Sequence, residues 1–193
     1  AILDDHDPEA PIAFVGHGNA DTFYQVNLIG THKLLTALAA CDKTPECVLL
    51  ASSANVYGNT TEGVLCETTP LNPANDYAVS KLAMEYMARL WMDKLPIVIA
   101  RPFNYTGVGQ AESFLLPKIV NHFRRKAPVI ELGNMEVWRD FSDVRDVAVA
   151  YRALLESDTA VGQTVNVCSG RLISLREVLQ MAQHITGHEI EAV

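Results

Sequence analysis

The sequence predicts an α/β fold built on a parallel sheet. Stretches of helical periodicity alternate with short apolar runs, and no internal repeat or low-complexity tract interrupts them. Residues 21–40 place Val26, Ile29, Leu34, Leu35 and Leu38 at helical spacing, and the apolar run 47–51 that follows is typical of a strand buried on both faces. This alternation indicates strands joined by right-handed helical crossovers.

The remaining elements continue the pattern. We expect helices at 77–93, 113–125, 144–156 and 174–185, and strands at 97–100, 129–132 and 164–168. Pro96 ends the first of these helices, and Ser174 with Glu177 forms a capping box for the last. Ligands of parallel sheets bind at the carboxyl ends of the strands, so the residues after Ala51 and Ala100 are the first candidates for a site.

Composition excludes several classes of protein. The 193 residues are 49% hydrophobic and 20% charged, which suits one globular domain or one domain with part of another. No apolar run is long enough to span a membrane, the first residues do not resemble a signal peptide, and the net charge of −8 argues against nucleic acid or an anionic membrane as a partner. The four cysteines and six histidines lack metal-ligand spacing, so we expect reduced thiols, a cytoplasmic protein and no metal.

Tyr77 and Lys81 lie four residues apart, on one face of the predicted helix. One interpretation is a partly exposed tyrosine beside a solvated lysine. The other is chemical, because a nearby cation favours the phenolate and lowers the pKa of a tyrosine toward the range useful for proton transfer. Ser52 and Ser53 follow the first predicted strand directly and supply hydroxyl groups at its carboxyl end.

Ser53, Tyr77 and Lys81 together resemble the Ser/Thr–Tyr–Lys site of the extended short-chain dehydrogenase/reductases, which modify nucleotide sugars. The resemblance favours Ser53 over Ser52 because the family hydroxyl stands four residues before the Tyr of a Tyr-Gly pair, here Tyr57-Gly58. It implies that Tyr77 is the acid/base, that Lys81 binds the nicotinamide ribose and tunes Tyr77, and that Ser53 holds the substrate oxygen.

Further segments extend the resemblance over most of the chain. They are 26–31, the loop with Glu67, Pro70 and Pro73, 100–110, 139–146 and 166–170. The family pattern implies cofactor contacts at Asn27, Ala51, Ser52, Tyr77, Lys81, Pro102 and Phe103. It implies substrate contacts at Ser53, Asn55, Asn104, Lys118 and Arg139, with Arg139 on the diphosphate. Lys118 could also be an ordinary exposed lysine, and Arg139 could instead pair with Asp140 or Asp143.

One position separates members of this family. Its dehydratases place an acidic residue after the hydroxyl to remove a sugar proton, whereas this chain has Ala54 and Asn55, and an amide cannot act as a general base near neutral pH. The resemblance therefore implies an NAD(P)-dependent reductase that transfers a hydride to C4 of a nucleotide-linked 4-keto-6-deoxy sugar, with GDP-4-keto-6-deoxymannose first. The alternatives are an NAD-dependent 4-epimerase and a non-catalytic nucleotide-sugar sensor.

The family's glycine-rich strand–loop–helix unit, which holds the cofactor pyrophosphate, does not occur in this sequence. We therefore expect part of a longer Rossmann-type protein with helices on both faces of its sheet. Residues 1–104 would be the remainder of the dinucleotide-binding domain, and 105–193 mostly the substrate-binding part, with elements that return to the first domain and an incomplete C-terminus. The choice between NADP and NAD stays open, and the resemblance implies a homodimer.

Overall fold

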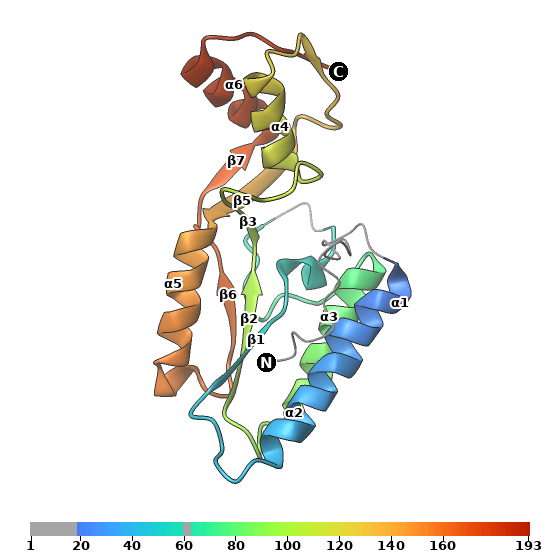
Figure 1. Ribbon diagram of the computed structural model, residues 1–193, viewed down its shortest axis with the longest axis vertical. Coiled ribbons are helices and arrows are strands. Elements are labelled where there is room, and N and C mark those ends of the chain that lie inside the picture. The colour runs from blue at the N-terminus through green and yellow to red at the C-terminus, as the bar shows by residue number, and fades with distance from the viewer. Residues whose placement is uncertain (1–18, 60–62) are drawn as a thin grey trace. The chain divides into compact units, whose positions relative to one another are not determined.

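The computed structural model describes residues 19–59 and 63–193 (Figure 1). The chain divides into two compact units. The first, which we call the helical unit, comprises the described residues of Ala1–Val48 and Asn55–Ile97. The second, which we call the sheet unit, comprises Leu49–Ala54 and Val98–Val193. Each unit is described by itself below.

The helical unit begins with a continuous helical stretch in three parts, α1 (Ala20–Phe23), η1 (Tyr24–Gly30) and α2 (Thr31–Ala39). The side chain of Asn19 caps its start by accepting the N–H of Asp21 at 3.0 Å. The predicted helix 21–40 is confirmed, but its middle part, η1, is a π-helix that a search for the 3.6-residue period does not reveal.

Helix α3 (Asp76–Arg89) packs beside η1 and α2. It begins at the N-cap Asn75, whose side chain accepts the N–H of Ala78 at 2.9 Å. It ends four residues before the predicted limit of 93, because the N–H groups of Leu90 and Trp91 bond to carbonyls three residues back and close the helix with tight turns.

A short 3₁₀ helix, η2 (Ala54–Tyr57), precedes the loop that leads to α3. This loop returns against η2, where the N–H of Asn72 donates to the carbonyl of Val56 at 3.0 Å. Gly58 makes the turn with φ of 77°, and a Cβ there would lie 1.9 Å from the carbonyl oxygen of Asn72. Only glycine fits this close approach.

The main sheet has the order β1 (Val48–Ala51), β2 (Ile97–Pro102), β6 (Thr164–Val167). Strands β2 and β6 pair in parallel, from Ile99 opposite Thr164 to Pro102 opposite Val167, as the sequence predicts. Helix α5 (Val144–Leu155) covers one face, since Val147 packs with Ala100 and Val167 in one apolar cluster. Asp143 caps α5 through the N–H of Arg145 at 2.8 Å. After α5, the 3₁₀ helix η3 (Asp158–Ala160) leads to β6.

A second sheet has the order β3 (Asn104–Thr106), β5 (Trp138–Asp143), β7 (Leu172–Ser174). Strand β5 is parallel to β3 and antiparallel to β7. None of these three strands is predicted from the sequence, because they are short or polar and lack an apolar run like those of the main sheet.

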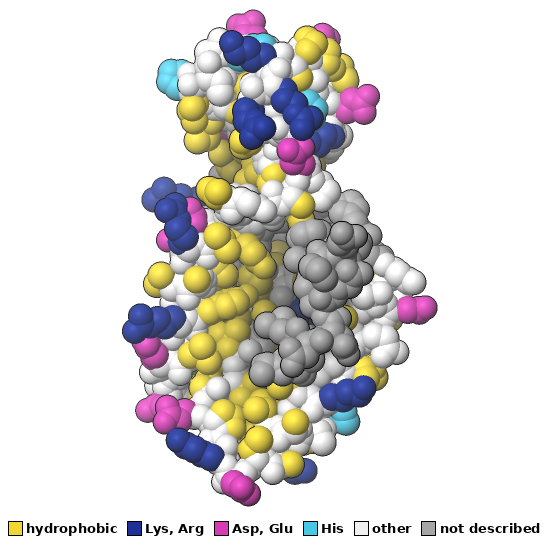
Figure 2. Space-filling model, viewed as in Figure 1, with side chains coloured by type: hydrophobic (Ala, Val, Ile, Leu, Met, Phe, Trp, Pro, Cys, Tyr) yellow, Lys and Arg dark blue, Asp and Glu magenta, His cyan; other side chains and the backbone are white. Residues whose placement is uncertain are grey.

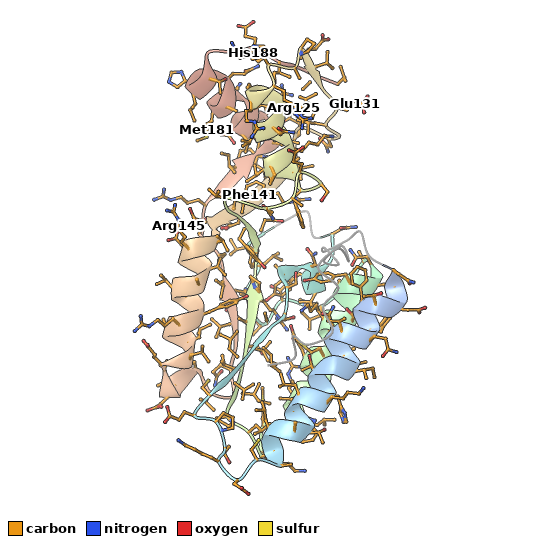
Figure 3. All side chains as sticks on the ribbon, viewed as in Figure 1. Arg125, Glu131, Phe141, Arg145, Met181 and His188 are labelled. Carbon is orange, nitrogen blue, oxygen red and sulfur yellow. The ribbon has the colours of Figure 1, made fainter. Side chains whose placement is uncertain are left out.

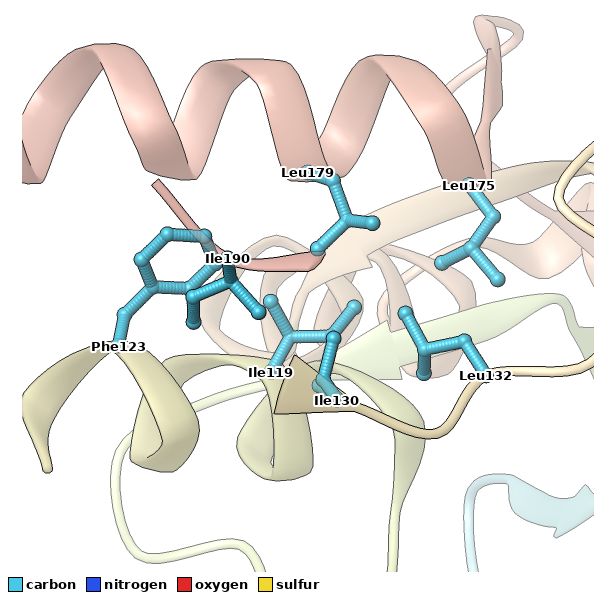
Figure 4. Packing of buried hydrophobic residues seen from close by; sticks show 7 residues of the cluster. All are labelled: Ile119, Phe123, Ile130, Leu132, Leu175, Leu179 and Ile190. Carbon is cyan, nitrogen blue, oxygen red and sulfur yellow. The ribbon is translucent and has the colours of Figure 1, made fainter. Parts of the chain in front are cut away.

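Two helices and a two-stranded sheet complete the sheet unit. They are α4 (Leu115–Arg124), α6 (Leu175–Thr186), β4 (Val129–Ile130) and β8 (Glu191–Ala192). Their buried core, shown in Figure 4, consists of Ile119, Phe123, Ile130, Leu132, Leu175, Leu179 and Ile190. The predicted capping box of Ser174 and Glu177 is confirmed at the start of α6. In the described part of the chain, no helix is long and apolar enough to cross a membrane.

Candidate active site

Helix α3 carries Tyr77 and Lys81 in its first two turns. The Tyr77 side chain is buried, with 9% of the residue exposed, and its ring meets the Phe23 ring edge-on at a centroid distance of 5.6 Å. The Lys81 Nζ lies 5.8 Å from the centre of the Tyr77 ring. The structure therefore excludes a partly exposed tyrosine beside a fully solvated lysine.

Burial lowers the pKa of Lys81 from its usual 10.5 to about 8. The ammonium group is still mostly protonated at neutral pH, so Tyr77 has a positive charge beside it that water hydrates poorly. Such a charge stabilises the phenolate more than a hydrated ammonium does. The Lys81 ammonium therefore favours the charge that Tyr77 would carry after it gives up its proton.

Asn27, in the π-helix η1, connects to this pair through Ser80. Its Nδ2 donates to Ser80 Oγ at 2.9 Å, and Ser80 Oγ donates to the carbonyl of Tyr77 at 2.7 Å. Ser80 is completely buried and is a positioning residue that the sequence analysis does not identify. A second link joins the same elements, because the Tyr24 hydroxyl donates to Asp76 Oδ1 at 3.0 Å, which raises the pKa of Tyr24.

In the sheet unit, the candidate residues lie where neighbouring strands end. Ala51 is the last residue of β1, and Ser52 and Ser53 follow it; both serines are buried. The Ser52 N–H donates to the carbonyl of Ala100 at 2.7 Å. Pro102 ends β2, and the Phe103 N–H donates to the carbonyl of Val167 at 2.9 Å. The sheet therefore gathers these groups at one edge.

Asn104 and Arg139 both lie on the second sheet, in the neighbouring strands β3 and β5. Asn104 lies opposite Phe141 (labelled in Figure 3), and its Nδ2 donates to the main-chain carbonyl of Asp140 at 3.3 Å. Arg139 is exposed, and its guanidinium donates to the carbonyl of Trp138 at 2.9 Å. It pairs with neither Asp140 nor Asp143, because Asp143 forms an ion pair with Arg145 at 2.6 Å.

The Asp140 carboxylate has a structural role that sequence reasoning missed. It is buried, with 6% of the residue exposed, and it accepts the backbone N–H groups of Ser169, Gly170 and Arg171 at 2.9, 2.7 and 3.2 Å. No local pattern reveals this, since its partners lie 29 to 31 residues further along the chain.

The other two candidates, Lys118 and Asn55, lie on α4 and η2. Lys118 Nζ, on α4, donates to the main-chain carbonyl of Glu131 at 2.6 Å. Figure 2 shows several Lys and Arg side chains in this region, where Figure 3 labels Arg125. Asn55 is exposed in η2 of the helical unit.

Two further observations concern metals and thiols. Within residues 19–59 and 63–193, no three His, Cys, Asp or Glu side chains gather where they could hold a metal ion. In the described part of the chain, Cys41, Cys47, Cys66 and Cys168 form no disulfide.

Comparison with known proteins agrees with this fold and these residues. A sequence model of the family described as GDP-mannose 4,6 dehydratase matches residues 15–193. GDP-6-deoxy-D-talose 4-dehydrogenase of Aggregatibacter actinomycetemcomitans is 36% identical over 94% of this chain and 62% of its own. GDP-6-deoxy-D-mannose reductase of Pseudomonas aeruginosa PAO1 is 39% identical over 88% of this chain and 58% of its own. The chain thus spans about three fifths of the length of these curated relatives.

Solved structures give the same result. RMD of Pseudomonas aeruginosa, complexed with NADPH, has a TM-score of 0.83 at 36% identity and covers 99% of this chain and 71% of its own. A Burkholderia cenocepacia J2315 protein, named provisionally as an epimerase, has a TM-score of 0.88 at 58% identity, over 93% of this chain and 59% of its own.

The parallel sheet with its covering helix, and the Tyr77–Lys81 pair on α3, define a Rossmann-type extended short-chain dehydrogenase/reductase. Within this class, the chain belongs to the GDP-mannose 4,6 dehydratase family.

Proposed function

We propose that the full-length protein is an NAD(P)-dependent reductase that transfers a hydride to C4 of a nucleotide-linked 4-keto-6-deoxy sugar, with GDP-4-keto-6-deoxymannose as the first candidate substrate. The observation that carries the proposal is the buried Tyr77 with the ammonium of Lys81 beside its ring. The names of the two curated relatives, a GDP-sugar reductase and a GDP-sugar 4-dehydrogenase, support the reaction and the nucleotide.

In this proposal Tyr77 donates its hydroxyl proton to the oxygen at C4 of the sugar. Lys81 stabilises the phenolate that remains, and the chain of Asn27 and Ser80 fixes the first turn of α3. Ser53 hydrogen-bonds the same sugar oxygen, Asn55 and Asn104 contact the sugar nucleotide, and Arg139 and Lys118 bind its phosphates.

The residues present fit the nicotinamide end of a dinucleotide. The ammonium group of a largely buried lysine, Lys81, suits ribose hydroxyls as partners, and Asn27, Ala51, Ser52, Pro102 and Phe103 would border the ring. A bound NADPH or NADH would supply the hydride. The glycine-rich loop for the pyrophosphate is not in this sequence, so the preference between the two cofactors lies outside it; the NADPH bound to RMD supports NADP.

Reduction is favoured over dehydration because Ala54 and Asn55 follow Ser53, and neither can remove a proton from carbon. A second candidate, nucleotide-sugar 4-epimerisation, is favoured by the epimerase name of the Burkholderia cenocepacia structure. It would use the same tyrosine and lysine with an NAD that stays bound.

We also propose the organisation of the whole protein. Residues 1–104 complete a dinucleotide-binding domain, and residues 105–193 belong mostly to the substrate-binding part. The protein acts in the cytoplasm as a homodimer. The dimer is supported by α3, whose Val79, Tyr86 and Leu90 are 38%, 58% and 79% exposed and share one face of the helix.

The test is Tyr77→Phe in the full-length protein, with Tyr86→Phe on the same helix as the matched control. Phe keeps the ring but removes the proton, so kcat for GDP-4-keto-6-deoxymannose with NADPH should fall by about 10²- to 10⁴-fold while KM changes little. A kcat within about threefold of wild type would contradict the role of Tyr77, since general acids contribute far more than this.

The same preparation tests the choice of reaction. Incubation with GDP-mannose and NADP should leave the mass of the sugar nucleotide unchanged. A product lighter by one water would show a dehydratase. Conversion between C4 epimers without added reductant would show the second candidate.

A further inference from the structure

Two arginines at or beside the β5–β7 pair, Arg139 and Arg171, form no ion pair with a carboxylate of the described residues. Among the described residues, ion pairs with a carboxylate are formed by Arg89, Arg125, Arg145, Arg152 and Arg176. Arg139 and Arg171 form none with the described residues. Arg124 also forms none, but it lies in the last turn of α4, where the helix carbonyls favour a cation. In a chain of net charge −8, two neighbouring arginines without a carboxylate are a local reversal of charge.

The strand register places these two arginines on one face. Strands β5 and β7 are antiparallel, with Arg139 opposite Ile173 and Asp140 opposite Leu172. Continued by one residue, this register sets Arg171 opposite Phe141. Because side chains alternate along a strand, Arg139, Phe141 and Arg171 share a face, and the two arginines are diagonal neighbours about 7–8 Å apart at the backbone. Two long guanidinium side chains at this spacing can reach one anionic group.

The Asp140 carboxylate explains why Arg171 stays unpaired and in place. Asp140 is the chain neighbour of Arg139 and lies opposite Leu172, the chain neighbour of Arg171. It forms an ion pair with neither arginine, because its two carboxylate oxygens accept the N–H groups of residues 169–171. These bonds fix the turn, which Gly170 allows with φ of 73°. The backbone of Arg171 is therefore held rigidly beside β5, while its exposed guanidinium is left available.

We propose that Arg171 is a second contact for the diphosphate of the substrate, acting together with Arg139. This inference rests on the proposed function, because the ligand is the diphosphate of a nucleotide sugar. A guanidinium offers two parallel N–H donors to phosphate oxygens, so two of them on one sheet face can engage the two phosphate groups of the same ligand.

The test is calorimetric titration of GDP into the full-length protein and three variants. Arg171→Gln removes the charge and keeps a polar side chain with an amide donor. Arg139→Gln is the reference, and Arg152→Gln is the control, since Arg152 is exposed on α5 and pairs with Glu156. We expect Arg171→Gln and Arg139→Gln each to weaken GDP binding about tenfold, as charge-assisted hydrogen bonds do. Arg152→Gln should bind as wild type. The deficit should shrink as salt rises, because screening weakens a charge contact.

Each other outcome decides the question. If wild type and Arg171→Gln bind GDP equally, the inference is wrong and the proposed function stands. If the deficit of Arg171→Gln does not shrink with salt, its cause is a disturbed turn and not a lost charge, and the inference is again wrong. If the wild type binds NADPH but no GDP, then a GDP-linked sugar is not the substrate. In that case the inference about Arg171 is wrong together with the proposed substrate class.

Discussion

At the scale of single residues, the most consequential group is the buried ammonium of Lys81. Its pKa in the folded protein is about 8, whereas an unfolded lysine titrates near 10.4. The unfolded chain therefore binds the proton more tightly, and folding carries a penalty below pH 8 that disappears as pH rises toward 10. This free-energy penalty arises at Lys81, whose side chain must be charged for the proposed proton transfer from Tyr77.

The first prediction follows from that penalty. The free energy of unfolding should gain up to about 3 kcal/mol from Lys81 between pH 8 and pH 10, at 1.36 kcal/mol per unit of pKa shift. Lys81→Met removes the titrating group, so its stability relative to wild type should be greatest at pH 7 and should decline through this window. Urea unfolding at four pH values measures it.

Lys33→Met provides the control for Lys81→Met, since Lys33 is exposed on α2. Its difference from wild type should not depend on pH. A pH-independent difference for Lys81→Met as well would show that the Lys81 ammonium is not strained in the folded protein.

Among the elements, the loop between η2 and α3 depends on one glycine. A methyl group on Gly58 would lie 1.9 Å from the Asn72 carbonyl oxygen, at a φ of 77°. Both the clash and the backbone conformation oppose any other residue. We expect Gly58→Ala to lower the free energy of unfolding by about 3 kcal/mol or more, because the backbone strain of about 1–3 kcal/mol adds to a displaced main chain.

Gly63 is the matched control in the same loop. Its φ is 81°, but a Cβ there would meet no atom of the described residues within 4 Å. Gly63→Ala should cost only the conformational strain, about 1 kcal/mol. Equal losses for the two variants, measured by chemical denaturation, would show that the contact with Asn72 is not what requires glycine at position 58.

The elements also show what sequence patterns can and cannot predict. Long helices and the strands of the main sheet are predicted because their apolar residues repeat with a clear period or form a run. Strands β3 and β5 are not predicted from the sequence, because their residues are largely polar and their extended conformation depends on pairing with distant segments. The π-helical geometry of η1 is not predicted either, because its wider turn gives no distinct signal in a pattern with a period of 3.6 residues.

The candidate site divides in the same way. Tyr77 and Lys81 can be identified from their spacing, because residues four positions apart lie on the same face of a helix. The links of Ser80 to Asn27 and of Asp140 to residues 169–171 are not found, because they join side chains to partners 29 to 53 residues away. Such contacts follow from the fold and not from any local pattern.

At the scale of the whole molecule, the exposed stripe on α3 predicts the oligomeric state. Val79, Tyr86 and Leu90 lie seven and four residues apart, and the neighbouring η1 exposes Val26 at 62%. We expect the full-length protein to have twice its chain mass by light scattering coupled to size exclusion. Leu90→Glu combined with Tyr86→Glu should give the single-chain mass, because charges in an apolar interface oppose association.

Val149→Glu is the control for this experiment, since Val149 is 68% exposed on α5 and lies outside the stripe. It should leave the mass unchanged. A double variant that still has twice the chain mass would move the interface elsewhere, and a wild-type protein with the single-chain mass would contradict the homodimer.

The Asp140 anchor has a consequence for how the residue at position 171 can vary. It holds the turn at residues 169–171 through main-chain N–H groups, which every amino acid except proline possesses. The bonds to Asp140 do not involve the side chain of Arg171, whereas Ser169 Oγ also accepts the N–H of Arg171 at 3.1 Å. Substitutions of Arg171 other than proline therefore change the charge and shape offered to a ligand while the turn keeps its place. Single mutations of Arg171 can therefore change substrate preference without unfolding the turn. Proline is the exception, because it has no N–H to donate to Asp140.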